Sequence, residues 1–159
     1  MLTQERLKEV LNYDSETGEF VWSITVNSRA KKGDVAGWND GYGYRRVTID
    51  GTRHRSHRIA WLYIYGAWPD KEIDHINGDR SDNRIANLRL ATRSENMQNL
   101  KSARRDSRSG LIGARFHKAS RKWVAEIKLG GKSQHLGCFM SKEDAHAAYM
   151  TAKASIHIC

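Results

Sequence analysis

Cysteine and proline are scarce in this sequence, and long apolar runs are missing from it. The 159 residues include two cysteines, Cys138 and Cys159, and one proline. Two cysteines without a Cys-x-x-Cys pair give neither a disulfide framework nor a cysteine-based zinc site, so a reducing compartment is expected. No apolar run reaches the roughly 18 residues of a membrane-spanning helix, and the first residues lack the apolar segment of a secretory signal. We therefore expect a cytoplasmic protein (host cytoplasm, if phage-encoded) without membrane contact.

Positive charge is concentrated in one part of the sequence. Residues 1–100 carry 15 lysines and arginines against 14 aspartates and glutamates, whereas residues 101–159 carry 12 against 4. A basic segment beside a nearly neutral one is typical of a polyanion-binding module joined to another domain. A merely soluble charged surface is the alternative. The length allows one ordinary domain or two small ones.

The first part of the chain combines short helical and strand patterns. Alternation around Asp50-Gly51 predicts a hairpin, and a compact apolar run closed by Gly66 predicts a buried helix. The predicted elements are a helix over 2–11, a strand over 20–22, hairpin strands over 44–49 and 52–57, and a helix over 59–65. They precede the polar stretch 73–96, around which we expect the chain to be organised.

The stretch 73–96 places polar residues at the ends of predicted elements. It predicts a strand, a loop, a second strand and a helix, with Asn77-Gly78 as a turn after the first strand. Thr92 and Glu95 have the spacing of a capping box, which marks the start of the helix. Polar groups from each of these pieces should therefore converge on one point.

The residues at this point suit the hydrolysis of a phosphodiester. A neutral His75 can activate water, because the unperturbed pKa of histidine is about 6.5. Asp74 is a hard oxygen ligand that suits Mg²⁺ or Mn²⁺ rather than zinc. Asn96, in the first helical turn, can direct its amide oxygen at the metal, and Asn87 can hold the loop and orient His75. Each residue type is common on surfaces and in turns, so the prediction depends on their combination.

The motifs DHINGD, NRIANLR and SENMQN closely resemble those of HNH endonucleases of the ββα-metal class, in particular the phage and intron-encoded homing type. The resemblance covers much of residues 1–100, including GYRRVTIDG and HRIAWLYIYGAWP. It implies that His75 is the general base, that Asp74 and Asn96 bind one divalent metal ion, and that Asn87 stabilises the loop and orients the histidine. No structural zinc is implied, because the zinc-binding cysteines of some relatives are missing. The products implied are a 5′-phosphate and a 3′-hydroxyl.

Three more residues of this part receive roles. Arg84 and Arg89 are candidates for contacts with DNA phosphates. His57, beside Arg58, recurs in similar sequences, and we assign it a structural role.

Residues 101–110 are basic and contain serine and glycine but few apolar side chains. This composition predicts a linker. The linker either lies on DNA, with Arg104 and Arg105 as contacts, or is a solvated tether.

Residues 111–159 change to a β pattern followed by a helix. Strands are predicted over 113–117, 123–129 and 132–139, with a turn at Gly130-Gly131 and a helix from Ser141, and alternation places Trp123 on the helix side of the sheet. The segments SGLIGARFHK, KWVAEIKLGGKSQHLGCF and SKEDAHAAY resemble the three-stranded DNA-binding domain of plant ethylene-response factors, the APETALA type. That resemblance implies a sheet laid in the DNA major groove. The positions implied or close to those implied are Arg115, His117, Lys122, Lys128 and His135.

The sequence as a whole predicts an α+β protein of two domains. A ββα-metal HNH nuclease domain is expected over residues 1–100, with its core at about 70–100, and a small antiparallel sheet packed on one helix over 111–159. The predicted function is site-specific, metal-dependent cleavage of double-stranded DNA by a monomer that nicks one strand, or by a weak dimer. One alternative is a DNA-binding regulator whose nuclease half is only a scaffold. An RNA-directed protein is a second, disfavoured because the predicted sheet face lacks aromatic residues for stacking.

Overall fold

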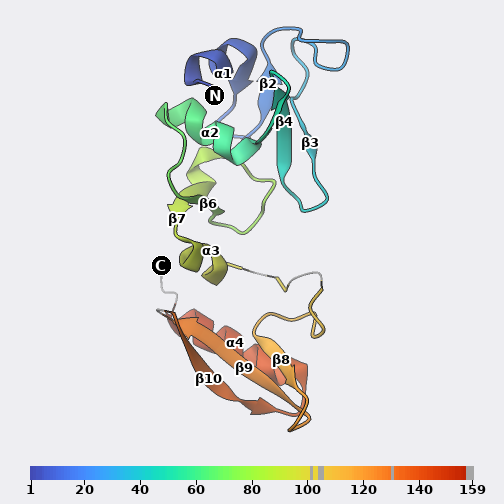
Figure 1. Ribbon diagram of the computed structural model, residues 1–159, viewed down its shortest axis with the longest axis vertical. Helices are drawn as coiled ribbons and strands as arrows, with labels where there is room; N and C mark the ends of the chain where they lie inside the picture. The colour runs from blue at the N-terminus through green and yellow to red at the C-terminus, as the bar shows by residue number, and fades with distance from the viewer. Residues whose placement is uncertain (101, 104–105, 130, 157–159) are drawn as a thin grey trace. The chain divides into compact units, whose positions relative to one another are not determined.

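The computed structural model describes residues 1–100, 102–103, 106–129 and 131–156. It divides into two compact units, Met1–Asn99 and Leu100–Cys159, which Figure 1 colours blue to yellow-green and yellow-orange to red. The predicted α+β class is confirmed, since both units combine helices with small antiparallel sheets. Within the described residues, no helix is long and apolar enough to cross a membrane.

The first unit begins with helix α1 (Gln4–Val10) and a short hairpin. Thr3 caps α1 by accepting a hydrogen bond from the backbone N–H of Arg6, as an N-cap residue should. Strands β1 (Leu11–Tyr13) and β2 (Phe20–Trp22) pair antiparallel. The turn between them is closed by Asp14, whose carboxylate accepts the N–H groups of two following residues. This hairpin places Tyr13 and Gly18 where later parts of the chain pack.

A second sheet has the order β3-β4-β5, formed by Trp38–Asn39, Arg45–Ile49 and Thr52–Arg55. The predicted turn at Asp50 and Gly51 is confirmed, with φ angles of 47° and 76° that match a tight hairpin connection. The helix that follows, α2 (Ser56–Tyr65), begins three residues earlier than predicted. The prediction that residues 56 and 57 continue the strand is therefore wrong, because both already lie in α2. Gly66 ends α2 in the left-handed conformation.

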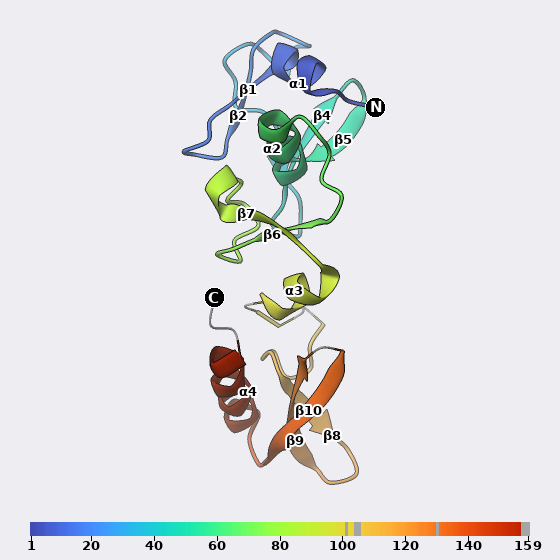
Figure 2. The ribbon, with the colours of Figure 1, turned by 90° about the vertical axis from the view of Figure 1, so that its left-hand side faces the viewer.

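The core of the first unit lies between α1, α2 and the strands around them. Figures 1 and 2 show the two helices side by side. The fully buried side chains include Leu7, Phe20, Val47 and Ile59, which come from four different elements. Burying one such side chain contributes roughly 1.5–3 kcal/mol. The polar stretch 73–96 is anchored to this core, because Ile73 and Leu88 belong to the same buried cluster.

The polar stretch folds as predicted into strand, loop, strand and helix. Strands β6 (Glu72–His75) and β7 (Leu88–Ala91) pair antiparallel, and the 3₁₀-helix η1 (Ile85–Asn87) leads into β7. Helix α3 (Arg93–Gln98) starts at a capping box in which Thr92 and Glu95 bond each other's backbone N–H. Asp74 and His75 thus lie at the end of β6, where the loop begins.

The second unit is one sheet against one helix. Strands β8 (Ala114–His117), β9 (Lys122–Leu129) and β10 (Lys132–Phe139) have the order β10-β9-β8, and α4 (Lys142–Ile156) runs along one face of the sheet (Figure 2). Trp123 packs with the small core of this unit around Ala125 and Ala145, which confirms its predicted core position. The register of β9 and β10 shifts between His135 and Gly137. Gly130, of the predicted turn, lies outside the described residues.

The end of the predicted linker is folded onto the second unit. Ser109 is buried, and its hydroxyl both accepts from the N–H and donates to the carbonyl of Leu111. Lys142, at the start of α4, donates to the Ser109 carbonyl at 3.2 Å. A free tether over the whole of 101–110 is therefore not what the structure shows, because these polar bonds fasten its last residues. Arg104 and Arg105, the predicted DNA contacts of this segment, lie outside the described residues.

Candidate active site

His75 lies at the end of β6 and is only 5% exposed. Its Nε2 is 3.4 Å from Oδ1 of Asn83, whose own Nδ2 donates to the Ser81 carbonyl at 2.9 Å. A carbonyl only accepts, so the Asn83 amide must turn its nitrogen to Ser81 and its oxygen to His75. Nε2 of His75 therefore carries the proton in the neutral ring, and Nδ1 is the nitrogen with a free lone pair.

The environment of His75 favours its neutral form. Burial lowers the pKa of His75 below 6.5, and the hydrogen bond to Asn83 and the charge of Asp74 offset this only in part. An imidazole with a lowered pKa is unprotonated at neutral pH and can accept a proton. His75 thus has the protonation state that a general base needs.

Asn83 is held by residues from the start of the chain. It is 1% exposed, and its carbonyl accepts a hydrogen bond from the Tyr13 hydroxyl at 2.7 Å. Burial raises the pKa of Tyr13 to about 12, so the phenol keeps its proton for this bond. At Gly18 (φ 75°), an added Cβ would lie 2.4 Å from the backbone nitrogen of Arg84. The β1–β2 hairpin therefore presses directly on the residues that orient His75.

Asn87 fastens the loop between β6 and η1. Its Oδ1 accepts from the N–H of Asn77 at 2.9 Å, and its Nδ2 donates to the Asn77 side chain and to the Asp82 carbonyl. These bonds fit the loop-stabilising role expected of Asn87. The sequence also predicts that Asn87 orients His75, and the side chain that contacts the His75 ring directly is Asn83.

Asp74 is buried and held from two sides. Arg89, directly opposite on β7, donates from Nε to Oδ2 at 3.0 Å. Asn99 donates from Nδ2 to both carboxylate oxygens, at 3.1 and 3.0 Å, and to the His75 carbonyl at 2.8 Å. Because that carbonyl only accepts, the amide nitrogen of Asn99, not its oxygen, must face Asp74. Asn99 is thus a clamp on the end of β6. Its position three residues after Asn96, on the same side of a helix, is the sequence signal that could have revealed it.

Asn96 lies in the first turn of α3, as the sequence predicts, but its amide contacts Glu72 rather than Asp74. Its Nδ2 donates to Glu72 at 2.8 Å, whereas Asn99 occupies the place beside Asp74. Residues 72 and 74 of β6 point to the same side, and α3 follows the strand so that each asparagine meets one of them. Because Nδ2 of Asn96 donates to Glu72, Oδ1 of Asn96 is the atom left to bind a metal ion.

The donor chemistry of this site fits a hard divalent ion. Asp74 offers carboxylate oxygens and Asn96 an amide oxygen, the ligand types that Mg²⁺ and Mn²⁺ prefer. Among the described residues, no group of three or more His, Cys, Asp or Glu side chains could hold a metal ion. A site with one carboxylate and one amide suits an ion that keeps several waters or takes phosphate oxygens as further ligands.

The two arginines predicted to contact phosphate have carboxylate partners within the chain. Arg84 makes two parallel bonds with Asp82, at 2.8 and 2.6 Å, and lowers the pKa of that carboxyl to about 2. Arg89 bonds Asp74. Much of the charge of both arginines is therefore already compensated.

Two aromatic rings stand against His75. The ring of His57, on α2, meets His75 edge to face, with centroids 5.0 Å apart. His57 is 4% exposed, its Nδ1 has no hydrogen-bond partner among the described residues, and burial lowers its pKa to about 3. Tyr44, just before β4, lies 5.4 Å from His57 and 6.1 Å from His75 between ring centroids. We therefore assign the predicted structural role of His57 to the wall of the candidate site, where its ring contacts His75.

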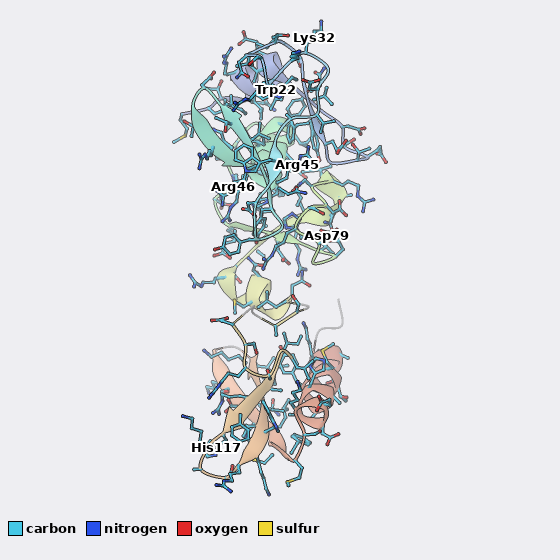
Figure 3. The ribbon with its side chains drawn as sticks, turned by 90° about the vertical axis from the view of Figure 1, so that its right-hand side faces the viewer. Trp22, Lys32, Arg45, Arg46, Asp79 and His117 are labelled. Atoms are coloured by element: carbon cyan, nitrogen blue, oxygen red, sulfur yellow. The ribbon has the colours of Figure 1, made fainter. Side chains whose placement is uncertain are left out.

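The structure brings the predicted contacts of the second unit to one sheet face. Strand pairing sets His117 opposite Lys122 and His135 opposite Glu126, and Figure 3 labels His117 near the end of β8. By alternation these positions face away from α4, whereas Trp123 and Ala125 face it. Arg115 pairs with Glu126 at 3.3 Å in an exposed ion pair. The exposed residues of this basic sheet face are Arg115, His117, Lys122, Lys128 and His135.

Comparison with known proteins agrees with the motif reading of the central segment. Residues 54–98 match the sequence model of a family described as HNH endonuclease. This matching segment contains α2, β6, β7 and α3 and is thus similar in sequence to HNH endonucleases. The match ends before the second unit, so the likeness of residues 111–159 to the plant DNA-binding domain remains a prediction.

Two proteins illustrate the breadth of the similarity. Protein 3.8 of Escherichia phage T7 is 35% identical over 82 residues, which are 51% of this chain and 66% of that protein. The chain thus spans just under two thirds of that relative. A solved structure of DNA binding and cleavage by the HNH homing endonuclease I-HmuI covers 92% of this chain and 80% of its own, at 20% identity and a TM-score of 0.43.

Proposed function

We propose that this protein is a site-specific, divalent-metal-dependent DNA endonuclease of the homing type. The observation that carries the proposal is His75, a buried neutral imidazole with Nδ1 available, adjacent to the held carboxylate of Asp74 in a segment that matches HNH endonucleases. Hydrolysis of a phosphodiester needs an activated water, and His75 Nδ1 is the proton acceptor for it. Asn83 keeps Nε2 occupied, so the proton can go only to Nδ1.

The metal side of the proposed site is Asp74 with Asn96. A divalent ion, when bound, stabilises charge on the phosphate and on the departing oxygen. Arg89 and Asn99 hold the Asp74 carboxylate from two directions, so its oxygens are placed before an ion arrives. Asn96 must release Glu72 or turn only its oxygen toward Asp74 to complete the pair.

Double-stranded DNA is the proposed substrate, and the second unit is its proposed reader. The basic sheet face offers exposed donors to phosphates and base edges, and its exposed residues include no Phe, Tyr or Trp of the kind that favours single strands. One chain supplies one His75. We therefore propose that a monomer nicks one strand and that a double-strand break needs a dimer or two visits.

The deciding experiment is cleavage of supercoiled plasmid that carries candidate host or phage DNA, with Mg²⁺, Mn²⁺ or EDTA, for the full chain and for His75→Ala. Open circles that appear only with metal and only with the unaltered protein are the expected result. Linear product would indicate that both strands are cut, rather than the single strand that we propose. DNA that is bound but uncut in every lane, with a target that the protein binds specifically, would favour the DNA-binding regulator over the enzyme.

A further inference from the structure

Tyr44 joins three distant parts of the first unit beside His75. The side chain lies just before β4 and is half-buried, with its ring against His57 and His75. Two guanidinium groups rest on the same ring: Arg55, from the end of β5, at 4.8 Å from the centroid, and Arg80, from the loop after β6, at 5.0 Å. Arg80 also donates to the Tyr42 carbonyl at 3.0 Å. One aromatic ring thus gathers two cations at the wall of the candidate active site.

These two arginines differ from the others around the site in their charge balance. Arg84 pairs with Asp82, Arg89 with Asp74, and Arg46, which lies opposite Arg55 on β4 (Figure 3), pairs with Asp40 at 2.8 Å. Among the described residues, the ion pairs include neither Arg55 nor Arg80. Both side chains are exposed. An arginine already bound to a carboxylate contributes little net charge, whereas these two keep their positive charge exposed on the Tyr44 ring, whose centroid is 6.1 Å from that of His75.

A guanidinium on an aromatic ring is well suited to receive a phosphate. Its flat face lies toward the ring while its N–H donors lie along its edge, where they can bind phosphate oxygens in pairs. The ring also restricts the side chain, so less rotational freedom is lost when an anion binds. An exposed cation–π contact is weak, so it biases the position of the arginine side chain without neutralising its charge.

We propose that Arg55 and Arg80, stacked on Tyr44, form a phosphate-binding pair that holds the DNA backbone beside His75. This pair takes the role that the sequence suggested for Arg84 and Arg89, which serve the loop and Asp74 instead. The proposal rests on the proposed nuclease function for its substrate. Tyr44 is a positioning residue in it, since the ring acts through the two arginines.

Binding without metal tests the pair independently of cleavage. The full chain, Arg55→Gln, Arg80→Gln and the double variant are titrated with a short fluorescent duplex in EDTA at several salt concentrations. The slope of log Kd against log salt should fall by about 0.9 for each arginine and about 1.8 for both. Arg58→Gln is the matched control, because Arg58 rests on Trp68 rather than Tyr44. An unchanged slope, or an equal fall in the control, would overturn the proposal.

Single-turnover nicking with Mg²⁺ tests the position of the pair. The double variant should cut about tenfold to a hundredfold more slowly, the range expected when hydrogen bonds to a charged group are lost. Tyr44→Phe keeps the ring and should cut at nearly the normal rate, whereas Tyr44→Leu removes it and should resemble the single arginine variants. Equal cleavage rates for Tyr44→Phe and Tyr44→Leu would exclude a role for the aromatic ring in positioning the two arginines. Melting followed by circular dichroism identifies variants that fail to fold.

The two proposals fail in different ways. If the unaltered protein cuts, His75→Ala does not, and the arginine variants change neither slope nor rate, only the phosphate pair is wrong. If the slopes fall as expected but no protein cuts its bound target with any metal, the pair stands as a DNA contact and the nuclease function is wrong.

Discussion

The polar residues of the two units are organised in opposite ways. Around His75, three asparagines have defined partners: Asn83 bonds the ring, Asn87 the loop and Asn99 the Asp74 carboxylate. On the basic sheet face of the second unit, the charged side chains are exposed, and the ion pair between Arg115 and Glu126 is a long one at 3.3 Å. The first arrangement fixes the positions of atoms, and the second exposes positive charge to solvent.

This difference shows how the two units can share one task. Chemistry on a phosphodiester depends on geometry at the level of fractions of an ångström, which a closed hydrogen-bond network supplies. Attraction to DNA depends on the number of cations and falls with salt. Changes in the first unit should therefore alter rates abruptly, and changes in the second should alter affinity gradually. Each prediction that follows tests one side of this contrast.

The largest effect is expected at Asn83. Asn83→Ala removes the acceptor that fixes the His75 ring, and cleavage should slow about a hundredfold with little loss of DNA affinity. Asn83→Asp keeps an acceptor but adds a negative charge, which raises the pKa of His75. The acid limb of the pH–rate profile should then move to higher pH. An acid limb at the same pH in Asn83→Asp as in the unaltered protein would contradict the orienting role of Asn83.

The next effect concerns the two asparagines of α3. Mn²⁺ binding, followed by electron paramagnetic resonance at constant pH, should weaken in both Asn96→Ala and Asn99→Ala. We expect a loss of about tenfold or more for Asn96, the proposed ligand, and a smaller loss for Asn99, which positions Asp74. Glu72→Gln should leave Mn²⁺ affinity unchanged or raise it, because the Asn96 amide is then held less strongly. Normal affinity in Asn96→Ala would exclude that residue as a ligand.

A graded effect is expected on the basic sheet face. The triple variant Arg115→Gln, Lys122→Gln and Lys128→Gln should reduce the slope of log Kd against log salt by about 2.7, or 0.9 for each cation. Glu126→Gln, on the same face, is the control of opposite sign and should tighten binding. The Mn²⁺ affinity of the first unit should be unaffected in both. A triple variant that binds its target normally would show that the reader lies elsewhere.

A smaller effect is expected from alanine substitutions of two glycines, which distinguish close packing from backbone strain. Gly18 and Gly51 have φ angles of 75° and 76°, but an added Cβ at Gly18 meets the Arg84 backbone while that at Gly51 meets nothing within 4 Å. Gly51→Ala should cost about 1 kcal/mol of unfolding free energy for its conformation alone. Gly18→Ala should cost more and should also slow cleavage, because it displaces Asn83. Equal losses of stability, measured by urea unfolding, would mean that the contact with residues 83 and 84 yields easily.

The last effect, smallest near neutral pH, is a dependence of stability on pH. Because the folded-state pKa of His57 is lowered to about 3, the unfolded chain binds a proton that the folded chain does not between pH 3 and 6.5. Stability is therefore complete above pH 6.5 and falls toward pH 3, by up to about 1.4 kcal/mol per pH unit for this one group. The lowered pKa of His75 acts in the same direction. His57→Phe should flatten the curve of urea midpoint against pH, and a curve of unchanged slope would contradict the assignment.

The sequence predicted the elements of the site better than its contacts. The Asn77-Gly78 turn and the capping box of Thr92 are local signals, and both elements formed where these signals placed them. The sequence assigned no role to Asn83, because its partner Tyr13 lies 70 positions away and no local pattern encodes that bond. The places of Asn96 and Asn99 depend on how α3 lies along β6, which is a tertiary property. For the same reason, the composition of the first part gave no sign that Arg55 and Arg80 share one ring.

The contact of Tyr13 and Gly18 with the Asn83 backbone limits how far the catalytic segment can be transplanted. Residues 54–98 contain the proposed base, its carboxylate neighbour and the amides of α3, and would look like a portable cassette to a protein engineer. Moved alone into a new scaffold, the cassette would leave behind the two residues that hold Asn83, which orients the His75 ring. A working graft would have to carry the β1–β2 hairpin as well, or rebuild a phenol donor and a close-fitting turn against residues 83 and 84.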